Sequence, residues 1–185
     1  MHEMSAVSRI ITRAAAAALL AAGPGLAAQS PADPGGIWRT EDNRARIRIE
    51  PCGSRPGQVC GYLVWMEDGL DPKGRPLRDL RNPDPARRSQ ALLGEQLLAG
   101  AVRPSDGRIA GRIYDAESGK SYDVTLWRDA DSLKVEGCVL AIFCATQTWS
   151  RVKDALPGQL VGATGAANGP RPEQVRARPP VPGQK

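Results

Sequence analysis

The sequence predicts an all-β protein, an antiparallel barrel of about eight strands with one long Pro-containing loop. The first observation is a series of short strand-like segments, separated by turn residues such as Gly, Asp and Pro. The second is that no segment of helical period lies between them, which argues against alternating strands and helices. Eight antiparallel strands are about the number that closes around a core or around one small ligand.

The first strands form a predicted meander. A short strand is expected at residues 37–40, and the next, at residues 44–50, has one apolar and one charged face. Its apolar side chains are Ala45, Ile47 and Ile49, and its charged ones are Arg44, Arg46, Arg48 and Glu50. This alternation is typical of a half-buried strand. Residues 53–57 then form a turn, and residues 59–66 supply the partner strand.

A long polar segment, residues 67–90, follows this pair of strands. It contains Pro72, Pro76, Pro83 and Pro85, so it is neither a central strand nor a regular helix. A connection of this length without structure of its own is unusual and is often functional. Beyond it, we expect further strands at residues 95–102, 107–114, 121–128, 133–139 and 143–152.

The two ends of the chain differ in composition from its middle. The N-terminal segment has the order of a secretory signal peptide: a basic start, an apolar run over residues 14–22, and small residues at a cleavage point near Ala27 or Ala28. Residues 154–185 hold six Pro, five Gly and no aromatic residue, a composition that predicts disorder. The predicted organisation is therefore a signal peptide at 1–28, a barrel domain at 29–153 and a disordered Pro/Gly-rich tail at 154–185.

Hydropathy and charge indicate where the protein resides and which partners it does not bind. The N-terminal apolar run is too short to span a bilayer, and no later segment is long and apolar enough to do so. We therefore expect a periplasmic or secreted protein with no transmembrane segment; the alternative is an Ala-rich helix of a cytoplasmic protein. The predicted domain holds 19 Lys and Arg against 17 Asp and Glu. This balance is too even to indicate nucleic-acid binding.

Four cysteines lie in the predicted domain, in two close pairs. An even number of cysteines behind a signal peptide indicates disulfides. Of the three possible connectivities we favour Cys52–Cys60 with Cys138–Cys144, because each pair flanks a turn between two expected strands. A four-cysteine zinc site is the alternative, but the gaps of seven and five residues exceed the usual spacing of zinc ligands.

Two short motifs stand in the first and last expected strands. Gly36-x-Trp38 opens the domain and Trp149-x-Arg151 lies near its end. The arrangement is similar to the closure of lipocalin-like (calycin) barrels, where an early Gly-x-Trp packs under a basic side chain of the last strand. A guanidinium over an indole ring is worth ~0.5–2 kcal/mol. The alternative is that Trp38 and Trp149 are separate core aromatics.

Taken together, seven ordered segments resemble the bacterial family called domain of unknown function 2147. They are residues 36–40, 52–61, 82–85, 111–115, 119–122, 135–138 and 146–151. The resemblance covers about residues 35–152 and implies an exported, lipocalin-type barrel, but no particular activity. In the family, Asn-Pro-Asp-Pro is followed by Arg-x-Arg-Pro-Leu. Here residues 88–92 read Arg-Ser-Gln-Ala-Leu, so no role of the second Arg is carried over.

Histidine argues against catalysis. The one His of the sequence is His2, inside the predicted signal peptide. A mature chain without it lacks the base for Ser/His/Asp or Cys/His chemistry and the commonest ligand for zinc or copper. Paired cysteines leave no thiolate either. We therefore predict no enzyme, no cofactor and no metal; the remaining catalytic hypothesis is a carboxylate hydrolase using loop acids such as Asp68, Asp71 and Asp84.

The function predicted for this exported cell-envelope protein is non-catalytic binding of a small hydrophobic or amphipathic ligand in the barrel. The candidate ligand-binding residues are Trp38, Asn82, Asp84, Arg88, Tyr114, Tyr122 and Arg151. Asn82 and Asp84 have a second interpretation, in which they cap their own loop. The alternative function is an envelope protein or polymer interaction module, which would use an exposed face of Arg44, Arg46 and Arg48, the long loop and the Pro-rich tail. The pattern leaves open whether the barrel is filled or hollow.

Overall fold

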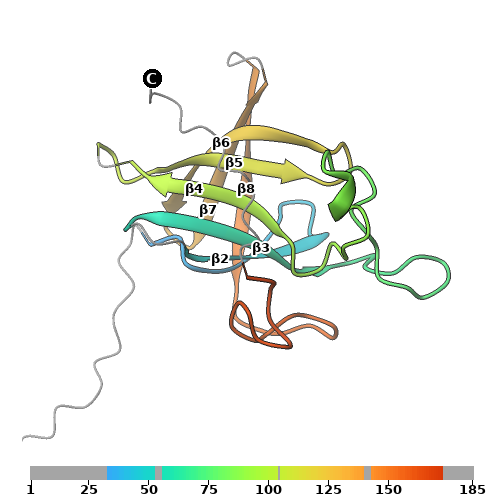
Figure 1. The fold of residues 1–185 in the computed structure, drawn as a ribbon. Coiled ribbons are helices and arrows are strands. Elements are labelled where there is room, and N and C mark those ends of the chain that lie inside the picture. Colours follow the sequence, from blue (N-terminus) through green and yellow to red (C-terminus); the bar gives the residue numbers. More distant parts are fainter. Residues whose placement is uncertain (1–32, 53–55, 104, 140–142, 173–185) are drawn as a thin grey trace, which may run out of the picture.

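The computed structural model describes residues 33–52, 56–103, 105–139 and 143–172. Its eight strands form one closed antiparallel barrel in chain order (Figure 1). The strands are β1 (Gly36–Arg39), β2 (Ala45–Pro51), β3 (Gln58–Met66), β4 (Gln96–Val102), β5 (Ile109–Asp115), β6 (Lys120–Asp129), β7 (Ser132–Val139) and β8 (Phe143–Val152). The helical content of these residues is one 3-10 turn, η1 (Pro85–Arg87). The predicted all-β barrel is confirmed, and the predicted signal peptide lies outside the described residues.

The barrel closes where the first strand meets the last. Each strand pairs with its successor, and β1 pairs with both β2 and β8. Trp38 stands opposite Ile47 on one side and opposite Arg151 on the other. The β1–β8 pairing covers three residues, Ile37–Arg39, although β8 is ten residues long. No helix in the described part of the chain is long and apolar enough to cross a membrane.

The interior of the barrel is filled by one cluster of apolar side chains. Its buried members are Trp38, Ile47, Ile49, Val59, Leu63, Leu98, Ile109, Val124, Leu126, Leu133, Val135 and Trp149. Every strand contributes at least one of them, because alternate residues of a strand point to the same face. Four, including Trp38, have no exposed surface at all. Full burial of such a side chain stabilises the fold by about 1.5–3 kcal/mol.

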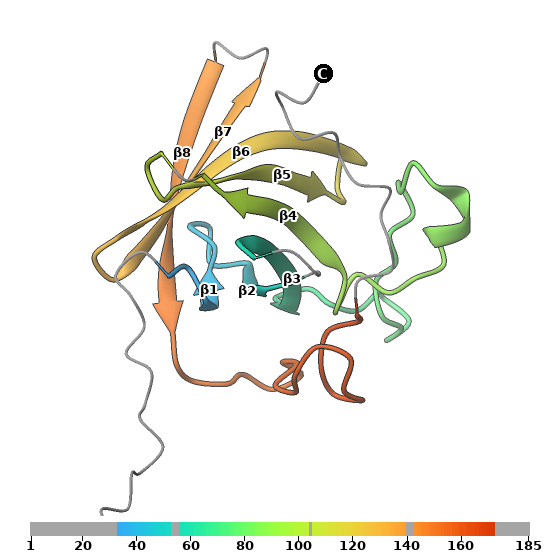
Figure 2. The ribbon, with the colours of Figure 1, turned by 60° about the vertical axis from the view of Figure 1, so that its left-hand side comes forward.

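A second, smaller cluster lies on the outer face of β3. Cys60, Tyr62 and Val64 are buried there, and Leu160 from the C-terminal segment packs against them. We call residues 154–172 the C-terminal strap; it runs beside β2 and β3 in both views (Figures 1 and 2). Its Leu160 N–H donates to the carbonyl of Val64 at 2.9 Å.

The packed strap differs from the disordered tail expected from residue 154 onward. The composition is poor in apolar residues, but the few it has are placed well: Leu160 extends the outer cluster and Pro170 is fully buried. Hydrogen bonds from the barrel hold the backbone between them. The remainder of the predicted tail, residues 173–185, lies outside the described residues.

The charged face predicted for β2 is also different from expectation. Arg46 is buried, with 4% of its surface exposed, and its guanidinium donates to the Asp154 side chain at 3.0 Å and to Gln159 at 2.9 Å. Arg48 donates to the strap carbonyls of Gly162 and Val161. The alternation of β2 is correct, but the strap covers much of its polar face, which is therefore not a free arginine surface.

Both predicted disulfides are present, each within a hairpin. Cys52–Cys60 joins the ends of β2 and β3, and Cys138–Cys144 joins β7 and β8 close to their turn. Closing such short loops stabilises by roughly 2–3 kcal/mol each in the chain-entropy account. The described residues contain no free cysteine.

Candidate functional site

One end of the barrel carries the long loop, and we call it the loop end. Because consecutive strands run in opposite directions, the β1–β2 turn, the β3–β4 connection and the β5–β6 turn all lie at this end. Partly buried apolar side chains pack against the core beside these connections. They are Ala45, Met66, Leu92, Leu97 and Ile113. At the loop end, the filled core is therefore followed by a layer of partly buried apolar side chains, which we call the apolar layer.

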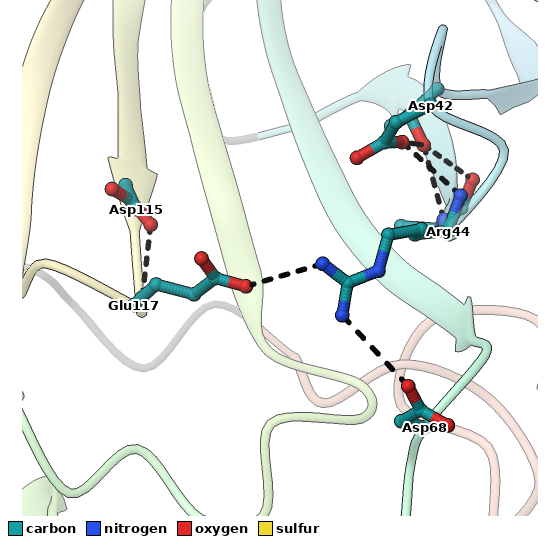
Figure 3. Close-up of polar contacts among 7 residues, drawn as sticks. Asp42, Arg44, Asp68, Asp115 and Glu117 are labelled. Carbon is teal, nitrogen blue, oxygen red and sulfur yellow. Dashed lines mark hydrogen bonds and ion pairs between the residues drawn. The ribbon is translucent and has the colours of Figure 1, made fainter.

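Charged residues adjoin this apolar layer in the chain. Arg44 precedes Ala45, while Asp68 follows Met66 by two residues. Figure 3 shows the Arg44 guanidinium between the carboxylates of Asp68 and Glu117, with nitrogen–oxygen distances of 3.8 and 4.0 Å. Since β3 and β4 lie between β2 and the β5–β6 turn, these ion pairs run across the ends of β3 and β4.

The ion pairs of Arg44 are weak in energy. All three side chains are largely exposed, and exposed pairs contribute ~0–1 kcal/mol. Both distances are also longer than a charge-assisted hydrogen bond, which is about 2.7–2.9 Å. The guanidinium of Arg44 therefore lies between two carboxylates without a short hydrogen bond to either.

The Arg44 backbone is more firmly fixed than its side chain. Asp42 accepts hydrogen bonds from the Thr40 hydroxyl at 2.6 Å and from the Arg44 N–H at 3.1 Å. The Thr40 bond is the main reason that the pKa of Asp42 lies below its usual value, and the Arg44 N–H adds to the effect. The turn that presents Arg44 is thus closed by its own side chains.

An open recess adjoins this group of charges. It has a volume of about 440 Å³ and is lined by Arg78, Leu80, Arg81, Ala116 and Glu117. Leu80 is 70% exposed, so the recess presents an apolar side chain between two arginines. Glu117 belongs both to the recess and to the ion pair with Arg44. The two features therefore form one continuous surface.

The predicted loop candidates are engaged with their own loop. Asn82 is buried, and its side-chain oxygen accepts from the Asp84 N–H at 2.9 Å. Asp84 caps η1 by accepting from the Ala86 N–H at 3.0 Å, and Arg88 donates to the Asn82 carbonyl at 2.8 Å. These contacts match the capping interpretation of the segment. Contact of Asn82, Asp84 and Arg88 with a ligand stays a prediction.

A buried carboxylate joins this loop to the barrel. Asp79 has no exposed surface and accepts hydrogen bonds from the Tyr114 hydroxyl at 2.7 Å and from the Asn82 amide at 2.5 Å. Gly119, at positive φ in the β5–β6 turn, lies against the Arg81 carbonyl so closely that a side chain has no room. Tyr114, a predicted candidate, therefore anchors the long loop; any ligand contact by it stays a prediction.

Two other candidates meet in the barrel wall, where β1 pairs with β8. The Arg151 guanidinium carbon lies 5.4 Å from the centre of the Trp38 ring, and that of Arg128 lies 5.2 Å from it. Trp38 also donates to the Pro34 carbonyl at 2.7 Å. The predicted pairing of Trp38 with Arg151 is present, and Arg128 joins it. A fully buried indole is a structural element here, and its contact with a ligand stays a prediction.

Tyr122, the remaining candidate, is half-buried on β6. It stands opposite Ile113 of β5, one of the apolar side chains of the loop end. Among the candidates it lies nearest in the strand register to this apolar layer. The structure thus groups Asn82, Asp84, Arg88 and Tyr114 around Asp79, groups Trp38 with Arg151, and leaves Tyr122 apart.

The acids of the described residues were considered as metal ligands, and Asp71 as a candidate catalytic carboxylate. No group of three or more Asp, Glu, His or Cys among them could hold a metal ion. Asp71 accepts from the backbone N–H groups of Lys73 and Arg75 and from the Arg75 side chain. The Arg75 N–H is the largest cause of the lowered pKa of Asp71. Asp71 is thus the cap of an exposed turn.

Sequence reasoning missed the residues that form the loop-end surface. Arg44 lies on the charged face predicted for residues 44–50, and Glu117 lies between the strands predicted at 107–114 and 121–128. Both lie in short polar stretches with no motif of their own, and the contact between them joins residues far apart in the chain. Asp79 had no signal to separate it from the other acids of its loop. One signal was present: the unusual length of residues 67–90.

The fold is that of a small closed antiparallel β-barrel with two disulfides, each within a hairpin of the barrel. The chain belongs to the family described as an uncharacterized protein conserved in bacteria (DUF2147), whose model matches residues 36–151. The match runs from the first residue of β1 to the last but one of β8, so the family resemblance of the sequence is confirmed. No curated protein and no solved structure matches the chain.

Proposed function

We propose that this protein binds a small amphipathic molecule with an anionic head group at the loop end of its barrel. The observation that carries the proposal is the position of Arg44, which precedes Ala45 of the apolar layer in the chain and whose guanidinium lies between Asp68 and Glu117 at 3.8 and 4.0 Å. A guanidinium has five N–H donors in a planar fork and suits a carboxylate or phosphate. The apolar part of the ligand would pack on side chains such as Met66, Leu97 and Ile113.

The filled core supports binding at the end of the barrel and not in its depth. Twelve buried apolar side chains occupy the interior around Trp38, where a ligand would have to displace close packing. Arg78 and Arg81 line the adjacent recess, so positive charge extends beyond Arg44. Asp68 and Glu117 offset part of that charge, which makes the sign of the head group the sharpest point to test.

The proposed binding is non-catalytic and takes place outside the cytoplasm. The sequence offers no His beyond His2, and the described cysteines are all paired. Two disulfides support an oxidising compartment such as the periplasm. Mass measurement of the protein recovered from a bacterial host would test export, with cleavage expected after Ala27 or Ala28. Recovery of the uncleaved chain from the cytoplasm would contradict this part of the proposal.

Calorimetric titration with two single-chain amphiphiles tests the site. Dodecyl phosphate and dodecyltrimethylammonium share their tail and differ in head-group charge, and both are used below their micelle concentrations. We expect the phosphate to bind at least tenfold more tightly, a difference of about 1.4 kcal/mol. Arg44→Gln should remove most of this preference, whereas Arg103→Gln, at the opposite end of the barrel, should not.

Each other outcome weighs against the proposal. Tighter binding of the trimethylammonium compound would assign the site to Asp68 and Glu117 and overturn the anionic head group. Equal binding by the Arg44→Gln and unsubstituted proteins would place the ligand elsewhere. No binding of either amphiphile would remove the support for a ligand of this class.

A further inference from the structure

The hairpin of β7 and β8 extends beyond the barrel. On one side, β7 pairs with β6 only as far as Cys138, opposite Asp123. On the other side, β8 begins to pair with β1 at Ser150, opposite Arg39. The two strands stay paired with each other through Phe143. Figures 1 and 2 show this hairpin leaving the body of the barrel at an angle to the other strands.

One consequence is an open sheet edge on β8. Residues 143–149 pair with β7 on one side, and no strand of the described chain pairs with them on the other. Residues 143–147 are exposed, and Phe143 is exposed over 67% of its surface. An edge of this kind presents a row of backbone N–H and C=O groups that can pair with another strand.

The side chains do not protect this edge. Edge strands are usually blunted by charged residues, Pro or bulges, and residues 143–149 read Phe-Cys-Ala-Thr-Gln-Thr-Trp, with no charge and no Pro. The β7–β8 register is also continuous, without a bulge, over all eight pairs. Thr, Phe and Trp are moreover among the residues that favour strands. Residues 143–149 of β8 can therefore pair with a further strand.

The hairpin is held ready for such pairing. The Cys138–Cys144 disulfide joins β7 and β8 at residues that stand directly opposite each other. It ties Cys144, on the stretch of β8 that β1 does not pair with, to Cys138, which β6 still supports. A strand ordered in advance loses less conformational freedom when it binds.

We propose that this edge pairs antiparallel with the same edge of a second copy of the chain. A second copy can pair with this edge without like-charge repulsion, because residues 143–149 carry no charge and like charges opposite each other destabilise strand pairs. With the twofold axis at Thr146, each Thr146 stands opposite its counterpart, and Ala145 stands opposite Gln147. Such an isologous contact closes after two subunits. The two barrels then share one continuous sheet through their β7–β8 hairpins.

Thr146→Lys tests this contact with little expected cost to the monomer. Thr146 is exposed and stands opposite Glu136 of β7, so a single Lys gains an opposite charge. In the dimer two Lys side chains would meet across the axis. The matched control is Thr125→Lys, because Thr125 stands opposite Glu136 from β6, away from the edge.

Sedimentation analysis over a range of concentrations gives the main readout. We expect the unsubstituted protein to form dimers, Thr146→Lys to weaken dimerisation at least tenfold, and Thr125→Lys to leave it unchanged. Thr146→Cys should further give a covalent dimer without reductant, since directly opposed strand residues come within disulfide reach. Ser121→Cys, on the interior strand β6, should give none. Circular dichroism checks that each variant is folded.

Two results would overturn the inference. A protein that stays monomeric up to its solubility limit has no self-pairing edge, and capture of an extended peptide by that monomer would assign the edge to another partner. A dimer that Thr146→Lys leaves intact, with no Thr146→Cys cross-link, would place the interface elsewhere on the molecule.

Discussion

The guanidinium of Arg46 donates to the Asp154 carboxylate at 3.0 Å and to the Asp154 carbonyl at 2.9 Å, across 108 positions of the chain. The contact between Arg46 and Asp154 joins β2 to the start of the C-terminal strap. Gln159 accepts a further hydrogen bond from the same guanidinium. Because Arg46 is buried, these contacts replace water that the charged group would otherwise bind. The strap is therefore part of the folded unit.

Removal of the strap should destabilise the barrel. Deletion of residues 154–185 exposes the outer cluster of Cys60, Tyr62 and Val64 and removes Asp154 and Gln159, which accept hydrogen bonds from the Arg46 guanidinium. We expect a loss of about 3 kcal/mol, from the burial of Leu160 and the hydrogen bonds of a charged group, measured by urea unfolding. Deletion of residues 173–185 alone keeps every described contact and is the control. Equal stability of both truncated proteins would show that the strap contributes nothing.

Acid should loosen the strap through Asp154. The Arg46 guanidinium, by donating to this carboxylate, holds the pKa of Asp154 below its ordinary value of 3.8. A lowered folded pKa means that the contribution is present above about pH 3.8 and is lost as the pH falls through the folded pKa. The stability difference between the unsubstituted protein and Asp154→Asn should therefore shrink below about pH 4.

Urea unfolding between pH 2.5 and 6, chosen to bracket the ordinary carboxylate pKa of ~3.9, measures this difference. Asp131→Asn, in the exposed β6–β7 turn, controls for the general effect of removing one carboxylate. A stability difference for Asp154→Asn that persists unchanged at the acid limit would contradict the assignment to the Arg46 pair.

The loop anchor at Asp79 should be sensitive to one hydroxyl. Tyr114→Phe removes a donor from a fully buried carboxylate and leaves the rest of the side chain in place. The expected cost is about 1–3 kcal/mol, the range for a buried polar group left short of a hydrogen bond. Thermal unfolding measures it, with Tyr122→Phe on the half-buried neighbouring strand position as control. If both variants lose equally little, Asp79 does not depend on Tyr114.

Features that depend on near neighbours in the chain were mostly predictable from the sequence, whereas most contacts between distant residues were not. The alternation at residues 44–50, the turns and the two disulfides were predictable, because each depends on near neighbours in the chain. The pairing of Trp38 with Arg151 was also predicted, from two short motifs that the barrel closure brings together. The strap was not, since nothing local to Arg46 shows that Asp154 and Gln159 will cover it.

The loop end illustrates the same division. Asn82 and Asp84 belong to a recognisable Pro-bracketed motif, and their capping contacts follow from it. Arg44 and Glu117 meet only because three connections of the barrel lie at one end. Asp79 is one of several loop acids, and its burial depends on Tyr114 from β5. Predictions of a site from residue type therefore found the loop, but not the charged surface beside it.

The packing of Arg151 on Trp38, where the barrel closes, can be tested by substitution of Gly36, with a second glycine of positive φ as the control. Gly36 has a φ of +134°, and a Cβ built on it would lie 2.9 Å from the Arg151 guanidinium. Gly36→Ala should therefore combine backbone strain, about 1–3 kcal/mol, with displacement of Arg151 from the indole of Trp38. Gly74 also has positive φ, at +72°, but nothing lies within 4 Å of its built Cβ.

Gly74→Ala should thus show a backbone cost without a side-chain clash, and we expect a larger loss in Gly36→Ala from its more restricted φ together with the Arg151 contact. Urea unfolding gives the two losses, and the emission spectrum of the tryptophans shows whether the surroundings of Trp38 have changed. If Gly36→Ala loses no more stability than Gly74→Ala and leaves the spectrum unaltered, Arg151 can move aside freely. In that case Arg128, the other guanidinium near the Trp38 ring, would be sufficient for closure.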